Sequence, residues 1–308
     1  MARDLGIGRV FAEGAEEEVR QTGDHERRVY ARGRSRRAAR YADAVRAQAV
    51  LISAVAAVLA AVVAVTVVVL LRPAGDAAPL EADEDFGDVR VYAIDLDGAP
   101  VPEPGPDAQR VWDLFVRVAT PAFAAEAMSE YRVGDAPDSD TMAYVHRDED
   151  DPTLWTLAAN IAYADDQDLL TSTLIHEYGH ILSLGLADVD PDADDCATFW
   201  IDEGCVAASS ALFAFDETFW SAYGDLAPAP DDTDAERGEA LFEAYPDDFV
   251  SDYAATNVVE DFAETFQAFV LEDEPAPDSP VAEKILFFWN LPAYVEVRER
   301  IRTDLGWP

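Results

Sequence analysis

The chain has 308 residues, half of them apolar, which gives room for about two average domains. Its formal net charge of −40 is unevenly spread: residues 1–72 hold 12 arginines against 8 acidic residues, and residues 73–308 hold 10 basic against 54 acidic residues. A field this negative repels nucleic-acid phosphates, so the composition argues against a nucleic-acid partner.

Residues 1–46 form an arginine-rich polar tail, and 25 uncharged, mostly aliphatic residues follow at 47–71. As a helix this stretch would be roughly 37 Å long, enough to cross a hydrocarbon core of about 30 Å. It is longer than the apolar region of a cleavable signal peptide, which predicts one uncleaved transmembrane helix. The arginines before it predict a cytoplasmic N-terminus and an extracytoplasmic remainder, as in a single-pass protein of the cell membrane.

An acidic linker is expected at 72–88, and a globular pattern at 89–308 predicts one domain. Within it, alternating apolar residues predict strands and 3.6-residue periodicity predicts helices. The expected strands are 89–94, 141–146 and 154–163, and the expected helices are 107–118, 169–184, 203–215, 236–244, 257–272, 280–290 and 292–305. Strands followed by mostly helices imply an α+β fold.

The chain has two cysteines, Cys196 and Cys205, both on the side predicted to be exported. In an oxidising compartment a disulfide that closes this short loop is expected, because the spacing matches no usual zinc pattern. Aspartates alternate through 188–194 as in a calcium loop. Ala193 and Phe199 stand where that loop has Gly and Glu, which favours an ordinary acidic loop.

The most informative segment is His176–His180, which has the H-E-x-x-H pattern and lies inside the helix expected at 169–184. Residues four apart share one face of a helix, so both imidazoles can bind one zinc ion. Glu177 is placed to take a proton from the water that zinc activates, as a general base. The motif holds two of only four histidines in the chain, which argues against an incidental pair.

A catalytic zinc site needs a third protein ligand, and no third histidine follows within reach. Two glutamates are candidates. Glu203, within Trp200–Gly204, resembles the Trp-x-x-Glu-Gly segment that supplies this ligand in aminopeptidase-like gluzincins. The other is Glu260, and Glu264 one helical turn beyond it could orient a ligating histidine.

The second segment resembles the gluzincin peptidases of the anthrax lethal factor type, whose catalytic domain carries a Tyr, an Asn four residues on and then Glu-x-x-Ala-Glu. Here these positions are Tyr253, Asn257 and Glu260 to Glu264. Residues 140–305 are more closely similar to bacterial zinc-binding metallopeptidases with the same Tyr-Ala-Ala-Thr-Asn run. The resemblance implies a zincin-like fold, Glu260 as the third ligand and Tyr253 as a hydrogen-bond donor to the reacting carbonyl oxygen.

These features predict a membrane-anchored, exported zinc peptidase that hydrolyses peptide bonds in a peptide or protein substrate. The segment 155–163 precedes the metal helix and is expected to be either the sheet-edge strand along which an extended peptide lies or a plain core strand. The alternative function is an inactive binding or scaffold domain at the cell surface. Glu177 beside both histidines argues against it, because a purely structural zinc site needs no base.

Overall fold

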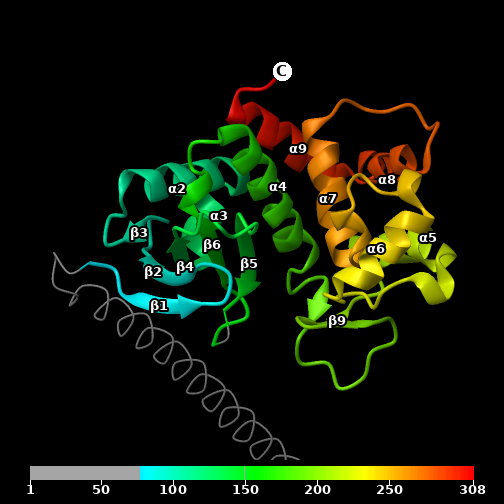
Figure 1. Cartoon of the computed structure of the whole chain (residues 1–308), viewed down its shortest axis with the longest axis horizontal. Coiled ribbons are helices and arrows are strands. Elements are labelled where there is room, and N and C mark those ends of the chain that lie inside the picture. The colour runs from blue at the N-terminus through cyan, green and yellow to red at the C-terminus, as the bar shows by residue number, and fades with distance from the viewer. Residues whose placement is uncertain (1–76, 149) are drawn as a thin grey trace, which may run out of the picture. The chain divides into compact units, whose positions relative to one another are not determined.

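The computed structural model describes residues 77–148 and 150–308, which form an α+β domain with two sheets and eight α-helices (Figure 1). The segment at 47–71 that was expected to span a membrane lies outside these residues. Within them, no helix is long and apolar enough to cross a membrane. The longest, α4, has 17 residues, about 26 Å, and carries acidic residues and histidines. The predicted fold class with its transmembrane helix, and the predicted single-pass location, are therefore wrong for the described part of the chain.

The larger sheet has six strands and is formed by the part of the chain before α4. They are β1 (Leu80–Asp83), β2 (Gly87–Ile94), β3 (Pro100–Val101), β4 (Met128–Gly134), β5 (Ala143–Arg147) and β6 (Trp155–Asn160). Their order is β1-β2-β4-β6-β5, with β3 paired to β2. β4 and β6 are parallel, and the other pairs are antiparallel. The sheet thus begins inside the stretch expected to be a linker.

One edge of this sheet is β5, and β6 lies inside the sheet between β4 and β5. All six residues of β6 are buried, because the strand is covered on both faces. Of the two expectations for 155–163, the edge strand is therefore wrong and the core strand is confirmed. Its nearly unbroken run of apolar residues is typical of an interior strand, whereas an edge strand has one side free.

Three helices follow or interrupt these strands, namely α2 (Pro106–Ala119), α3 (Pro121–Ala127) and α4 (Gln167–Ser183). α2 packs on the sheet through its apolar face, and Tyr131 of β4 donates its hydroxyl to Ala108 O of α2 at 3.0 Å. α4 runs past β5 on the side that faces the C-terminal helices (Figure 1). It therefore has protein on both sides, which explains why twelve of its residues are buried.

The C-terminal half is helical, with α5 (Ala211–Phe219), α6 (Ala235–Ala244), α7 (Val258–Leu271), α8 (Pro280–Trp289) and α9 (Pro292–Leu305). α7 is the central helix of this half and packs directly against α4. Rings from α5, α7 and α8 interlock around Phe288, which is fully buried and lies 4.9 Å from Phe262 between ring centres. Burial of such a side chain contributes about 1.5–3 kcal/mol, so this aromatic core holds α7 in place.

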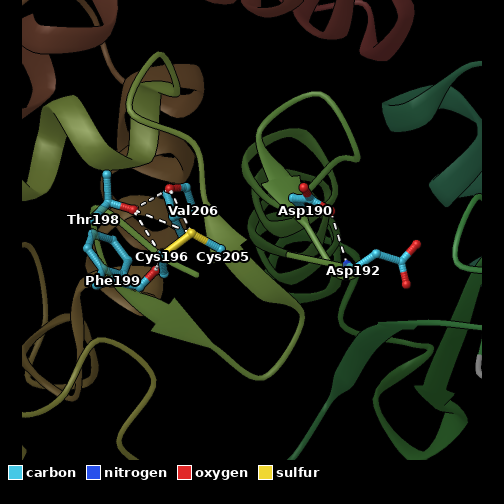
Figure 2. The surroundings of a disulfide bond; sticks show 7 residues. All are labelled: Asp190, Asp192, Cys196, Thr198, Phe199, Cys205 and Val206. Carbon is cyan, nitrogen blue, oxygen red and sulfur yellow. Dashed lines mark hydrogen bonds between the residues drawn. A yellow bond between two sulfur atoms is a disulfide. The ribbon is translucent and has the colours of Figure 1, made fainter. Parts of the chain in front are cut away.

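A small three-stranded sheet and a disulfide join α4 to the C-terminal half. The strands are β7 (Val189–Asp190), β8 (Trp200–Ile201) and β9 (Gly204–Val206). Cys196 and Cys205 are bonded, with their Cα atoms 5.5 Å apart, which confirms the predicted disulfide (Figure 2). Thr198 donates its hydroxyl to the carbonyl of Val206 beside it. The bond thus closes the loop that precedes β8 onto β9.

The helix expected at 203–215 begins later, at Ala211. Gly204 lies in β9 with a φ of 135°, and a Cβ there would come 2.4 Å from Asp190 O, so only glycine fits. Ser210 then caps α5, because its hydroxyl accepts a hydrogen bond from Phe213 N at 3.0 Å. The apolar periodicity correctly predicts the helix from residue 211 onward. The close contact between Gly204 and the backbone of Asp190 places the residues around Gly204 in strand β9 instead.

Candidate metal centre

Both histidines of the H-E-x-x-H segment lie on the buried side of α4 that faces α7. His176 is 6% exposed and His180 8% exposed. One helical turn separates them, and their Nε2 atoms are 3.0 Å apart. Two imidazole nitrogens that converge in a buried place are costly unless an ion or a proton joins them.

The N-terminal turn of α7 brings Glu260 to the same place. Asn257 caps this helix, since its Oδ1 accepts from Glu260 N at 2.8 Å. Glu260 Oε2 lies 3.2 Å from His176 Nε2 and 3.3 Å from His180 Nε2. Three side chains from two helices therefore point their ligand atoms at one another.

Small residues allow α4 and α7 to approach this closely. A Cβ on Gly179 would come 3.0 Å from the Phe266 ring and 3.2 Å from Ala263 Cα. Gly179 lies within the H-E-x-x-H segment, and Ala263 lies between Glu260 and Glu264. These small residues thus have a packing role: they let the two helices bring their ligand atoms together.

The distances fit a single metal ion. Ligands about 2.0 Å from a tetrahedral zinc would be roughly 3.3 Å apart, close to the separations of 3.0, 3.2 and 3.3 Å found here. Glu260 Oε2 is buried and has no hydrogen-bond partner in the described residues. Within residues 77–148 and 150–308, His176, His180 and Glu260 are the only such group of three. The predicted metal triad is therefore present as a possible metal-binding site, and neither Glu203 nor the acidic loop at 188–194 forms another.

The electrostatics of the triad favour a positive charge at its centre. Burial lowers the pKa of His176, but the nearby carboxylates of Glu260, Glu264 and Glu177 raise it overall to about 10. Burial would raise the pKa of Glu260, but both histidines hold it well below its usual range. The carboxylates thus stabilise a cation between the rings, either a proton or a metal ion.

Glu264 contacts the far side of the His176 ring. Its Oε1 lies 2.8 Å from His176 Nδ1, and its Oε2 accepts a hydrogen bond from Ser251 Oγ at 2.6 Å. A carboxylate at this distance favours a proton on Nδ1, and a neutral ring of that tautomer would keep its Nε2 lone pair for a metal. Ser251 was not singled out from the sequence, because nothing local connects it with a residue 13 positions away.

Glu177 lines an open cavity of about 530 Å³, which His176 of the triad and Glu264 also line. It is 5% exposed, and burial raises the pKa of its carboxyl to about 7, although both histidines and the backbone of Val145 act in the other direction. The cavity is bounded by β5 and the loop before it, by α4 and by α7. Glu177 is therefore a titratable group at the boundary between the triad and a space large enough for a ligand.

Tyr253 lies on the same cavity, in a short 3₁₀ helix before α7. Its side chain is half exposed, and its ring centre is 6.0 Å from that of His176. Burial of the hydroxyl end, together with the charges of Glu260 and Glu177, raises its pKa. The hydroxyl therefore stays protonated and can act as a hydrogen-bond donor.

Glu203, the alternative third ligand, is not part of the triad. Burial is the main cause of its raised pKa, and the charges of His180 and Arg147 lower it in part. It belongs to the small sheet region, between β8 and β9, rather than to α7.

Comparison with models of known protein families, with curated proteins and with solved structures finds no match. The function must therefore be argued from the chemistry of this site.

Proposed function

We propose that the chain is a zinc-dependent peptidase. The observation that carries the proposal is the convergence of His176 Nε2, His180 Nε2 and Glu260 Oε2 within 3.3 Å of one another. Two histidines and one glutamate are a donor set of catalytic zinc sites, which keep a further position for water or substrate. The adjacent cavity and the carboxyl of Glu177 on it suit a catalytic centre better than a closed structural site.

The chain's own residues would carry the proton transfers. When bound, zinc acidifies water and polarises a carbonyl group. Glu177 would accept the proton from the attacking water and return it to the amine that leaves. Burial raises the pKa of its carboxyl, which favours a group that both takes and gives a proton. Tyr253 would donate a hydrogen bond to the carbonyl oxygen as negative charge develops there.

The free edge of β5 supports a peptide as the substrate. Met142 O accepts from Asn160 N, and Asp148 N donates to Leu154 O, so the even-numbered residues bond to β6. The backbone groups of Ala143 between them therefore face away from β6, and Ala143 also lines the cavity. An extended peptide can add to such an edge by main-chain hydrogen bonds and lie across the centre.

The test separates metal binding from hydrolysis. We expect the purified protein to bind about one zinc and to cleave peptides from a mixed library. Glu177→Gln should keep the metal, because Glu177 is not a ligand. It should lower kcat/KM by about 10²–10⁴, because an amide cannot accept the proton. Glu203→Gln is the matched control and should remain active.

Two outcomes would contradict the proposal. Full activity of Glu177→Gln would exclude the general-base mechanism. A native protein that holds zinc but cleaves nothing in the library would instead favour the alternative function, an inactive binding domain.

A further inference from the structure

The cavity beside the triad is lined by three acidic groups, and its one basic group is His176 of the triad. None of its lining residues is lysine or arginine, and three are carboxylic acids: Asp140, Glu177 and Glu264. Glu177 and Glu264 face the metal centre and its histidine. Asp140 is exposed at the rim, and no hydrogen bond or ion pair within the described part of the chain engages its carboxylate. It is therefore available to a ligand.

Among the other polar groups of the wall, the hydroxyls of Ser172 and Tyr253 can donate, whereas Thr141, Thr173 and Gln267 present acceptor atoms. Thr173 donates its hydroxyl to a backbone carbonyl one turn back in α4 at 3.1 Å, and Thr141 donates to Asp85 Oδ1 at 3.3 Å. Gln267 Nε2 donates to Ser172 O at 2.9 Å, which fixes its amide so that Oε1 stays free. Because the hydroxyl protons of Thr141 and Thr173 are already donated within the protein, these two side chains and the Gln267 Oε1 atom can accept hydrogen bonds from a ligand.

Apolar side chains complete the wall. Met142, Ala143 and Leu169 line the cavity between the rim and the metal centre. A volume of about 530 Å³ accommodates a long side chain. Lysine and arginine combine an aliphatic stem with a donor-rich cationic head, and their stems pack well along apolar surface.

We infer that the part of this cavity lined by Asp140, Met142 and Leu169 is the specificity pocket of the centre and takes the basic side chain, lysine or arginine, of a peptide substrate. The aliphatic stem would lie on Met142 and Leu169, and the cationic head would bind at Asp140 and the neighbouring acceptors. The inference rests on the proposed peptidase function. The strongly negative charge of residues 73–308 also favours a basic substrate, because it attracts basic peptides and repels acidic ones.

The first measurement is a digest of a random-sequence peptide mixture by the zinc-loaded protein, with products identified by mass spectrometry. We expect lysine and arginine to be enriched at one fixed position relative to the cleaved bond. Matched peptides with lysine, norleucine or glutamate at that position should then differ. The lysine peptide should have a kcat/KM about tenfold above that of the norleucine peptide, and the glutamate peptide should be poorest.

The second measurement uses charge reversal. Asp140→Lys should abolish the preference for lysine over norleucine, whereas Asp138→Lys should leave it within about twofold. Asp138 is the matched control, because it is also exposed and gives the same change in net charge but does not line the cavity. Equal loss in both variants would mean that bulk charge selects the substrate and would overturn the pocket assignment.

A binding measurement keeps this inference separable from the proposed function. Fluorescent lysine and norleucine peptides are titrated into zinc-loaded Glu177→Gln protein, with and without Asp140→Lys. Tighter binding of the lysine peptide that depends on Asp140 supports the pocket even if no peptide is cleaved. Cleavage with no preference for a basic residue, or equal binding of the two peptides, would overturn the inference and leave the peptidase proposal standing.

Discussion

Glu260 and Asp261 are neighbours in the first turn of α7, and their carboxylates lie in two different polar clusters. The partners of Asp261 are all protein groups. Its Oδ2 accepts from Lys284 Nζ at 2.6 Å and from Trp220 Nε1 at 2.7 Å, and its Oδ1 accepts from Thr265 at 3.2 Å. Asp261 is fully buried and Lys284 is 1% exposed. This carboxylate is neutralised inside the fold by a lysine of the same chain.

Glu260 has no such lysine or arginine: within the described residues its ion-pair contacts are with His176 and His180 alone. A buried carboxylate needs a cation or hydrogen bonds, because an unpaired charge is strongly disfavoured in a protein interior. The comparison of neighbours thus separates a structural ion pair from a site for an ion. The cluster around Asp261 is complete, whereas the cluster around Glu260 is a possible site for a metal ion.

The largest expected effect comes from breaking the complete pair. Lys284→Met leaves Asp261 buried without its cation and should lower the free energy of unfolding by about 3–5 kcal/mol. Asp261→Asn added to Lys284→Met should recover most of this loss, because the buried charge is then removed. Urea denaturation of both variants in the presence of a chelator measures the effect without a contribution from metal. A loss below about 1 kcal/mol in the single variant would contradict the description of the pair.

The second-largest effect is expected on zinc binding when Glu260 is replaced. Glu260→Ala removes one of three ligands and should weaken zinc binding by more than about a hundredfold, beyond the effect typical of residues that only contact a ligand. Glu203→Ala should leave the affinity nearly unchanged, because Glu203 is not in the triad. Competition with a zinc-binding dye gives both affinities. Loss of zinc in Glu203→Ala with full retention in Glu260→Ala would instead support the aminopeptidase-like arrangement.

Local patterns predicted much of this site. The spacing of His176 and His180 and the periodicity of 169–184 depend on neighbours in sequence, so α4 and its two ligands could be placed. Most C-terminal helices could be placed for the same reason. The link to Glu260, 80 positions beyond His180, came from a resemblance between motifs rather than from any physical rule.

Features that depend on long-range packing were missed or misplaced. The order of strands put β6 inside the sheet and β5 at its edge, and pairing between distant strands leaves no signal in a single periodic segment. The lysine partner of Asp261, 23 positions away, is likewise defined only by the packing of α8 on α7. The expected membrane helix at 47–71 does not depend on long-range packing. It was predicted from the length of its apolar stretch alone.

A smaller effect is expected for the residue behind His176. Glu264→Ala removes the carboxylate that contacts His176 Nδ1 at 2.8 Å and should weaken zinc binding by about 10–100-fold. Glu264→Gln should have a milder effect, because an amide oxygen can still accept from Nδ1. The same dye competition applies. If Glu264→Ala binds zinc as tightly as the native protein, the contact does not orient the ring.

The smallest effect is expected at Asn257, whose side chain holds the turn that carries both neighbours. Its Oδ1 accepts from Glu260 N at 2.8 Å, and its Nδ2 donates to Asp232 O at 3.0 Å. Asn257→Ala should lower the free energy of unfolding by about 1 kcal/mol through loss of the cap, and Asn257→Ser, which can still cap, should lose less. Glu260 lies in the capped turn, so loss of the cap should displace it and lower the zinc affinity several-fold in Asn257→Ala. The affinity should recover in Asn257→Ser. The displacement should be limited, because three further bonds hold the neighbouring Asp261 in place. Thermal denaturation and zinc competition on the same samples check both effects. A loss of stability with unchanged zinc affinity would mean that the triad itself, rather than the cap, sets the position of Glu260.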